Sequence, residues 1–433
     1  MSISLSTPAP GGKPEARRVL MIAHDFPPVN RSSALRALKM SRYLNAYGWG
    51  VSVITGRIDA GCPTDAALLR DVPPDCRIHQ AFGFDTKAAL SVRGRYLRVL
   101  ATPDRHVSWF PHGVMTGVRV CRRDRADVLL STSPPVTAHC IGWAVSRITR
   151  RPWIVELRDP WNLDTPPGAL ARLDGHLERR ILTVADRVVV TTAGLAAALG
   201  HRFGEAIRHK TRLIPNGYDE DAFARLPEAV PLAGRFHISH TGQCMPPDRD
   251  PVPFLRVVRR CLDRGTLPAD TEVRFIGAGS AFAVRVGETL RQLRLESHVR
   301  ITDRLPHAAA VRATLEAPVL LLLQDRNEHR DSIPAKAYEY LRSPACILVL
   351  APPRSATTAL MKDFPGVLCA ASADSEAIAE RLEEAVALWK QAAGSLHFAR
   401  GVERYSSRRL AAELASLLED VYMPPQTADR CVR

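Results

Sequence analysis

The stretch 331–350 carries charged side chains at spacings that suit a phosphate-bearing ligand. Asp331 begins it, a turn at Pro334 follows, and Lys336 and Glu339 lie three residues apart on the helix predicted to start there. Proline is favoured in the first turn of a helix, and the free N–H groups at that end carry partial positive charge. A cation, N–H groups and a carboxylate are therefore predicted within about one and a half turns. An ordinary solvated helix with an N-cap aspartate is the structural alternative.

This stretch resembles the donor-site motif of glycosyltransferase family 4, the retaining GT-B enzymes that use nucleotide sugars. Two acidic residues separated by seven residues mark the motif, and Asp331 and Glu339 match them. The resemblance implies that Glu339 holds the nucleotide ribose and that Asp331 lies by the donor sugar. Asp331 is one methylene shorter than the glutamate of the family. Ser332 and Ile333, which follow it, are assigned to the donor site as well.

The second half of the chain supplies three more donor-site candidates. Gly242 and Gly277 each follow a predicted strand. In the family, the loop that contains position 249 here presents a cation to the donor diphosphate, and Arg249 is the best match. Gly277 also opens a Gly-Ala-Gly sequence, but the third glycine of a dinucleotide fingerprint is missing, since position 282 is Phe. A dehydrogenase is therefore rejected.

The first half opens with a predicted strand, loop, helix and strand over residues 18–55, a unit that predicts a right-handed crossover in a parallel sheet. Many family members carry a Phe-Pro-Pro loop and then a paired glycine. This chain has Asn30-Arg31-Ser32-Ser33 after its Phe-Pro-Pro sequence instead. Arg31 and Ser32 are predicted to donate hydrogen bonds to the donor phosphates, and a plain helix cap is the alternative.

Arg158 and Asp159 follow the predicted buried strand 153–157. Functional residues of open α/β sheets gather at the carboxyl ends of strands. Relatives often show an Arg-Asp-x-Trp sequence here, where other family members have a histidine facing the sugar. Arg158, Asp159 and Asp331 are therefore the predicted catalytic residues. An Arg–Asp pair that merely orders its loop is the alternative.

The length of 433 residues favours two domains. The alternating strands and helices predict the α/β class. The resemblance implies a GT-B fold, in which two Rossmann-like parallel-sheet domains face a cleft and a C-terminal helix crosses back to the first domain. The predicted segments are a disordered tail at 1–16, an N-terminal acceptor domain at 17–228, a donor domain at 229–405, the returning helix at 406–423 and a tail at 424–433.

Composition narrows the cellular setting. The net charge of +14 suits an anionic membrane surface or phosphorylated substrates, although a genome rich in Arg codons explains it equally well. The nine cysteines form no C-x-x-C pair, which predicts reduced thiols in the cytosol. The polar start lacks the apolar core of a secretory signal, and no apolar run approaches about 18 residues. The expected location is cytoplasmic, with peripheral attachment to the inner face of the membrane.

The resemblance implies a retaining hexosyltransferase that moves a sugar from a nucleotide diphosphate sugar to a saccharide or lipid-linked acceptor, in cell-surface polysaccharide or glycoconjugate biosynthesis. The nucleotide sugar is a substrate, and no cofactor or metal ligand is predicted. A catalytically inactive GT-B scaffold, acting as a binding or assembly subunit, is the alternative, because Asp331 and the missing glycine pair depart from the family. Nucleic acid is not an expected partner, since no basic cluster interleaves with aromatic residues.

Overall fold

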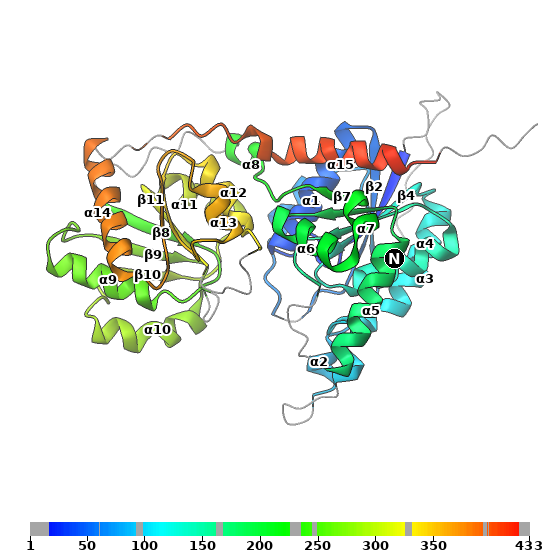
Figure 1. The fold of residues 1–433 in the computed structure, drawn as a ribbon, viewed down its shortest axis with the longest axis horizontal. Helices are drawn as coiled ribbons and strands as arrows, with labels where there is room; N and C mark the ends of the chain where they lie inside the picture. The colour runs from blue at the N-terminus through cyan, green and yellow to red at the C-terminus, as the bar shows by residue number, and fades with distance from the viewer. Residues whose placement is uncertain are drawn as a thin grey trace, which may run out of the picture.

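The fold comes from a computed structural model of the chain. It describes residues 17–59, 61–91, 98–161, 168–225, 235–244, 249–324, 331–392, 396 and 398–423. The two predicted tails and the predicted domain boundary between residues 228 and 229 lie outside these ranges. The described residues form two separate parallel sheets with helices packed around them (Figure 1).

The first sheet has seven parallel strands in the order β3-β2-β1-β4-β5-β6-β7. Its central strands are short and almost wholly buried, as expected for a parallel sheet covered on both faces. The strands are β1 (Arg17–Ile22), β2 (Trp49–Thr55), β3 (Arg77–Gln80), β4 (Val128–Ser133), β5 (Trp153–Leu157), β6 (Arg187–Val190) and β7 (Thr211–Leu213).

Helices cover both faces of this sheet. Alternate residues of β1 contribute to two different cores, Val19 and Met21 to one and Leu20 and Ile22 to the other. The helices of the first domain are α1 (Ser32–Ala46), α2 (Thr86–Ala89), α3 (Phe110–Arg123), α4 (Thr137–Thr149), α5 (Ala169–Val184), α6 (Ala193–Phe203) and α7 (Glu205–Lys210), with short 3-10 turns η1 (Ala66–Asp71), η2 (Arg98–Ala101) and η3 (Val107–Trp109).

The second sheet repeats this plan with six parallel strands in the order β10-β9-β8-β11-β12-β13. Its strands are β8 (His237–Thr241), β9 (Glu272–Ile276), β10 (Val299–Thr302), β11 (Val319–Leu323), β12 (Cys346–Leu350) and β13 (Val367–Ala370). Its helices are α9 (Val252–Asp263), α10 (Ser280–Gln292), α11 (His307–Glu316), α12 (Ala335–Arg342), α13 (Ala356–Met361) and α14 (Ser375–Gln391).

The last helix, α15 (Ser407–Val421), returns to the first domain as predicted. Its Leu410, Leu414 and Leu418 are buried in the core that also holds Val19 and Met21 of β1. Figure 1 shows it in red lying across the first domain, beside α1. A helix more than 180 residues after the first sheet therefore completes that sheet's core.

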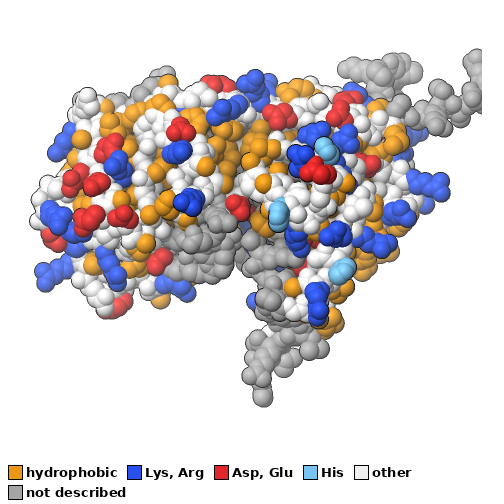
Figure 2. All heavy atoms as spheres, in the orientation of Figure 1, with side chains coloured by type: hydrophobic (Ala, Val, Ile, Leu, Met, Phe, Trp, Pro, Cys, Tyr) orange, Lys and Arg blue, Asp and Glu red, His pale blue; other side chains and the backbone are white. Residues whose placement is uncertain are grey.

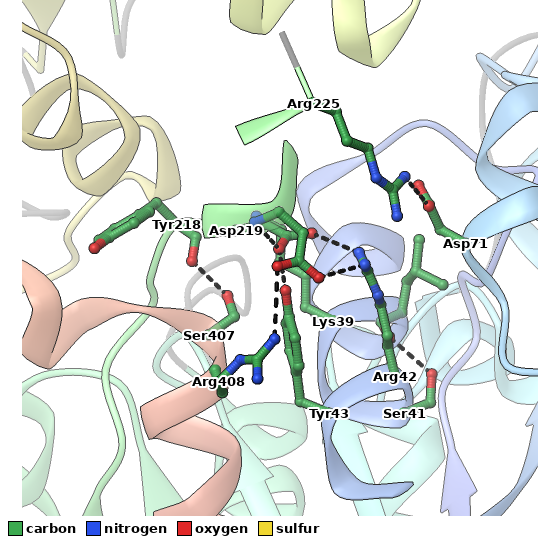
Figure 3. Close-up of polar contacts among 12 residues, drawn as sticks. Lys39, Ser41, Arg42, Tyr43, Asp71, Tyr218, Asp219, Arg225, Ser407 and Arg408 are labelled. Atoms are coloured by element: carbon green, nitrogen blue, oxygen red, sulfur yellow. Dashed lines mark hydrogen bonds and ion pairs between the residues drawn. The ribbon is translucent and has the colours of Figure 1, made fainter. Parts of the chain in front are cut away.

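The chain passes between the domains twice, and the two crossings run side by side. The first continues into α8 (Glu220–Ala224), and the second contains η5 (Glu403–Tyr405). Tyr218 N donates to Tyr405 O at 3.1 Å, and Ser407 donates to Tyr218 O through its N and its Oγ, both at 2.8 Å. Figure 3 shows Asp219 between Tyr43 and Arg42 of α1, and these contacts attach the first crossing to the first domain.

Candidate functional site

Both sheets change the direction of strand order beside their first strand, at β1 and at β8. Ligands of open α/β sheets bind outside the carboxyl ends of the strands at such a switch point. The first-domain loops after β1 and β2 contact the second-domain segment that follows β10. Arg304, just after β10, donates from Nη1 to the carbonyl of Asn30 at 2.7 Å, and His307 N donates to Asp65 Oδ2 at 2.9 Å. The site therefore lies where the two domains meet.

Lys336 lies at the centre of the second-domain side. Its Nζ is 3.0 Å from Nε2 of His240 and also donates to the carbonyl of Thr241, at the end of β8. Nδ1 of His240 is 2.9 Å from Leu321 O and donates to it, so Nε2 is the acceptor for Lys336. Burial, followed by Lys336, lowers the pKa of His240 well below its ordinary value, which keeps the ring neutral.

Lys336 shares its surroundings with other cations. Burial and then the nearby Arg249 lower the pKa of Lys336 to about 7, and Arg304 adds to the effect. The pKa of Arg304 is lowered in turn by burial and then by Arg31 of the first domain. We call these four residues the cation cluster: Lys336, Arg249, Arg304 and Arg31. Like charges held this close favour a polyanionic ligand between them.

Two glycines let the backbone come close to the cation cluster. Gly242 and Gly277 have φ angles of +92° and +87°, in the left-handed region that favours glycine. A Cβ at Gly242 would lie 3.3 Å from Lys336 Nζ, and a Cβ at Gly277 would lie 3.5 Å from Gly242 Cα and 3.7 Å from Arg304 Cα. The three loops after β8, β9 and β10 thus converge on Lys336.

Glu339 faces the first domain. Its Oε1 lies 3.5 Å from Nζ of Lys39 on α1. Burial lowers the pKa of His307, and the nearby charge of Glu339 opposes that shift. Glu339 is half-buried and Lys39 is buried. A carboxylate in this position can accept hydrogen bonds from hydroxyl groups of a ligand that also touches Lys336, three residues earlier on the same helix.

The first-domain loop that carries Arg31 is organised by Asp25. Asp25 Oδ2 accepts from Ser33 Oγ at 2.6 Å and lies 3.8 Å from Arg31 Nη1, and Oδ1 lies 3.1 Å from His24 Nδ1. Burial opposes ionisation, but the hydrogen bonds from His24 and Ser33 lower the pKa of Asp25 to about 2 overall. Ser32 begins α1 and is exposed, and no contact among the described residues joins it to the cation cluster.

Arg158 and Asp159 follow β5 on the first-domain side, and both are half-buried. Arg158 Nε donates to the carbonyl of Ser133 at 2.6 Å, at the end of β4. The pKa of Arg158 is lowered mainly by burial, while Glu156 and Asp159 raise it. Arg158 therefore fixes its loop to the neighbouring strand, as the structural alternative requires, and it remains a cation at the carboxyl edge of the sheet.

Asp331 precedes α12 of the second domain and lies against residues of the first domain. A Cβ at Gly194, at the start of α6, would lie 2.9 Å from Asp331 Oδ1. Asp331 also lines a cavity of about 170 Å³ with Trp161, Glu178 and Arg202 of the first domain. The loop of Arg158 and Asp159 continues directly into Trp161. Asp331 therefore lies near the segment that follows Arg158 and Asp159, but neither of those two residues lines this cavity.

Ser332 and Ile333 connect Asp331 to α12. The carbonyl of Ser332 accepts from Gln324 Nε2 at 3.1 Å and from Thr357 Oγ1 at 3.3 Å, which anchors the loop. Its hydroxyl is buried and has no hydrogen-bond partner among the described residues. Ile333 packs against the second domain's core. Ser332 Oγ is therefore free to hydrogen-bond to a ligand, whereas Ile333 has a packing role in the second domain.

Two residues of this site were missed by the sequence reasoning. Arg304 lies two residues after the end of β10, so the rule that functional residues lie at carboxyl ends of strands would have found it. Lys39 lies within α1, among residues with helical apolar spacing, and its partner Glu339 is 300 residues later. No local pattern signals such a contact.

Comparison with known proteins bears on this geometry. Residues 33–217 match the family model of the glycosyl transferase 4-like domain. The first domain is therefore similar to the glycosyl transferase 4-like domains. The predicted resemblance to glycosyltransferase family 4 is thereby confirmed. No curated protein sequence matches the chain.

Solved structures match over both domains. HepE from Anabaena, in complex with UDP and glucose, has a TM-score of 0.67 at 13% identity, over 93% of this chain and 100% of that one. Sucrose-phosphate synthase from Thermosynechococcus elongatus has a TM-score of 0.65 at 16% identity, over 93% and 98%. The lipopolysaccharide outer core galactosyltransferase WaaB, in its apo form, has a TM-score of 0.59 at 12% identity, over 93% and 99%. At these identities the likeness shows the shared GT-B fold, which confirms the predicted fold class.

Proposed function

We propose that this protein transfers a sugar from a nucleotide diphosphate sugar, with UDP as the expected nucleotide, to a saccharide or lipid-linked acceptor with retention. The observation that carries the proposal is the cation cluster, because it gathers four positive side chains from both domains around two close-packed glycines. The glycosyl transferase 4-like match supports sugar transfer, and the UDP bound to HepE supports the choice of nucleotide.

In this mechanism the diphosphate lies against the cation cluster, and Glu339 accepts hydrogen bonds from the ribose. Negative charge grows on the diphosphate as its bond to the sugar breaks. Lys336, Arg249 and Arg304 oppose that charge from fixed positions, so no reorganisation is needed at the moment of reaction. The acceptor approaches from the first domain, past Arg158 and Asp159. No metal is assigned a role, since the cations already serve the leaving group.

Lys336 and Arg249 allow a direct test of this assignment. Turnover is measured as release of UDP from UDP-glucose, with and without saccharide acceptors, and donor affinity is measured by calorimetry. Lys336→Ala and Arg249→Ala should each lower turnover about 10²–10³-fold, the scale for losing one preorganised donor. Arg285→Gln, an exposed second-domain cation on α10, is the matched control. Wild-type turnover in both alanine variants would place the donor site elsewhere.

The same panel separates transfer from the scaffold alternative. A scaffold would bind UDP and lose that binding in the Lys336 and Arg249 variants, yet the wild type would release no UDP from any nucleotide sugar. Analysis of the anomeric configuration of the product by NMR then tests retention. Asp159→Asn should lower turnover more than donor affinity, as expected for a contact made mainly in the transition state.

A further inference from the structure

A surface on the first domain is both apolar and basic. Fifteen large apolar side chains are exposed among the described residues, and the second domain contributes only Val284. Six of them come from residues 82–115, and we call these six the apolar edge: Phe82, Phe84, Leu90, Val99, Leu100 and Met115. Contiguous exposed apolar groups mark interaction sites on soluble domains. This concentration on one domain therefore requires an explanation that the transfer site does not supply.

The two phenylalanines are held outward by the fold. A Cβ at Gly83 would lie 2.7 Å from Cβ of Trp109, so Gly83 is packed against the body of the domain. Its neighbours therefore point away, and Phe82 and Phe84 are 53% and 41% exposed with ring centroids 6.2 Å apart. Phe84 N donates to Ser108 Oγ at 2.8 Å, and that hydroxyl donates back to Phe84 O at 2.6 Å. Packing and hydrogen bonds therefore hold this segment in place, and the two rings are exposed on it.

Other members of the apolar edge lie next to this segment. The backbone N of Phe82 donates to Nδ1 of His112 on α3, and Met115 is one helical turn further on. Thr86 N, at the start of α2, donates to Arg105 O at 2.7 Å, which joins the 82–90 strip to the chain that follows η2. Leu90 ends α2, and Val99 and Leu100 belong to η2.

The charge around the apolar edge is strongly positive. The described residues 77–91 and 98–125 hold eight Lys and Arg against three Asp and Glu, a net +5 within a chain of net +14. The three carboxylates have partners inside the domain: Asp85 with Arg105, Asp104 with backbone N–H groups, and Asp124 with Arg77 and His79. On α3, Arg119 and Arg122 are exposed along the same helix face as Met115. Figure 2 shows basic and hydrophobic side chains adjoining along this side of the first domain.

We propose that the apolar edge and the α3 arginines dock the first domain on an anionic lipid bilayer. Aromatic and aliphatic side chains next to arginines combine insertion into the headgroup boundary with attraction to anionic lipid. The surplus of positive charge favours this occupant over a second copy of the chain, because two such surfaces would repel each other. The docking does not depend on sugar transfer, and it would place the acceptor-side domain at the membrane.

Binding to sucrose-loaded vesicles tests the proposal with the full chain. The vesicles contain phosphatidylcholine alone or with about 30% phosphatidylglycerol, at about 0.1 M and about 0.5 M salt. The wild type should bind the anionic vesicles and lose most of that binding at high salt. Phe82→Ser/Phe84→Ser should weaken binding at least about tenfold, and Arg119→Gln/Arg122→Gln about tenfold or more. Val284→Ser/Arg285→Gln, an exposed pair on the second domain, should bind like the wild type.

UDP-induced thermal stabilisation is measured on every variant, so that a misfolded protein is recognised. A failure of UDP binding in the wild type would count against the proposed function and leave vesicle binding unaffected. The docking proposal is overturned if the wild type does not bind anionic vesicles, or if either first-domain variant binds as tightly as the wild type. It is also overturned if light scattering shows a dimer that Phe82→Ser/Phe84→Ser abolishes, since the surface then serves a second copy.

Discussion

Nζ of Lys39 on α1 lies 3.5 Å from Oε1 of Glu339 on α12, so an ion pair joins the two domains at the residue predicted to hold the ribose. The side chains are only 9% and 22% exposed, which reduces screening by solvent. A carboxylate has about four lone-pair sites, so Glu339 can accept from Lys39 and from a ribose at once. If Glu339 holds the ribose as proposed, Lys39 should affect nucleotide binding through Glu339.

Replacement of Glu339 tests this coupling. Glu339→Ala should lower UDP affinity by about 2–3 kcal/mol, as for hydrogen bonds to a charged group, or roughly 30- to 150-fold. Lys39→Met should weaken UDP binding in the wild-type background and have no further effect in Glu339→Ala. Calorimetry on the four proteins of this double-mutant cycle gives the coupling directly.

A ribose-specific control accompanies the cycle. The wild type should bind 2′-deoxy-UDP more weakly than UDP, and Glu339→Ala should bind the two alike. If Glu339→Ala still bound UDP more tightly than 2′-deoxy-UDP by the wild-type factor, another group would bind the ribose hydroxyl. Additive effects of Lys39→Met and Glu339→Ala would show that Lys39 acts independently of Glu339.

Donor binding should depend on pH through Lys336, whose pKa is lowered to about 7 by burial and then by Arg249. In the proposed donor site the ammonium form binds the diphosphate, and this form is lost as the pH rises through about 7 in the free protein. UDP-glucose affinity should therefore fall as the pH rises from about 7, by up to about tenfold per unit. Lys336→Met should bind weakly and without this pH dependence. Parallel pH profiles in the two proteins would assign the titration to another group.

Arg304 is predicted to act on the diphosphate as well as on the domain contact with Asn30. Arg304→Gln should lower UDP affinity about 10–100-fold, in the range for a lost charged hydrogen bond. Uridine, which lacks phosphates, should bind Arg304→Gln and the wild type alike. A parallel loss for uridine and UDP would mean that Arg304 only holds the domains together.

The buried pair of Arg36 and Glu156 should control stability. Arg36 Nη2 lies 2.7 Å from Glu156 Oε1 and donates to Ile214 O at 3.1 Å, which ties α1 to the loop after β7. Glu156→Gln should destabilise the fold by about 3–5 kcal/mol, because Arg36 would be left buried without its counter-charge. Urea unfolding measures the loss, and Glu205→Gln, at an exposed Arg208 pair, should change little.

Low pH should remove the stabilisation that the Arg36–Glu156 pair provides. Burial alone would raise the pKa of Glu156, but the charge and hydrogen bonds of Arg36 and the hydroxyl of Thr132 lower it below the ordinary value of 4.5. A lowered folded-state pKa adds stability above that ordinary value, and the gain disappears as the pH falls through the folded-state pKa. The difference in unfolding free energy between wild type and Glu156→Gln should therefore shrink in acid. A constant difference would contradict the assignment.

The sequence predicted the fold class well because its evidence is local. Short apolar strands such as 153–157 and 319–323, each followed by a loop and a helix, leave few arrangements other than two parallel sheets. The helix at 407–421 was placed on the first domain by resemblance, and its buried leucines confirm that placement.

The site was harder to predict because its contacts join distant residues. Gly242 and Lys336 could be nominated separately, but their closeness depends on how α12 docks on β8 through Tyr340 and Thr241. Lys39 has no signal of its own, since a buried lysine on an apolar helix face makes sense only beside Glu339 of the other domain. Periodicity describes one element at a time and carries no information on such pairs.

The proposed role of Asp331 beside the donor sugar requires its carboxylate to be held in place, and a substitution at Gly194 can displace that carboxylate. A Cβ at Gly194 would lie 2.9 Å from Asp331 Oδ1, closer than real Cβ contacts allow, so Gly194→Ala must displace the carboxylate. If Asp331 lies by the donor sugar, turnover should fall about 10–100-fold with little change in UDP affinity, since the reacting groups lose alignment. Asp331→Asn should show the same split between turnover and affinity.

Gly287→Ala is the matched control, because no atom outside its own helix lies within 4 Å of a Cβ there. It should retain wild-type turnover, and all three proteins should unfold at similar temperatures. Asp331 lies four residues before α12, whose N-cap is Pro334, so Gly194→Ala and Asp331→Asn with wild-type turnover would leave Asp331 only its contact with Gly194 of the first domain. A loss of UDP affinity equal to the loss of turnover would instead place Asp331 beside the nucleotide, and the sugar would then have to bind elsewhere in the interdomain region.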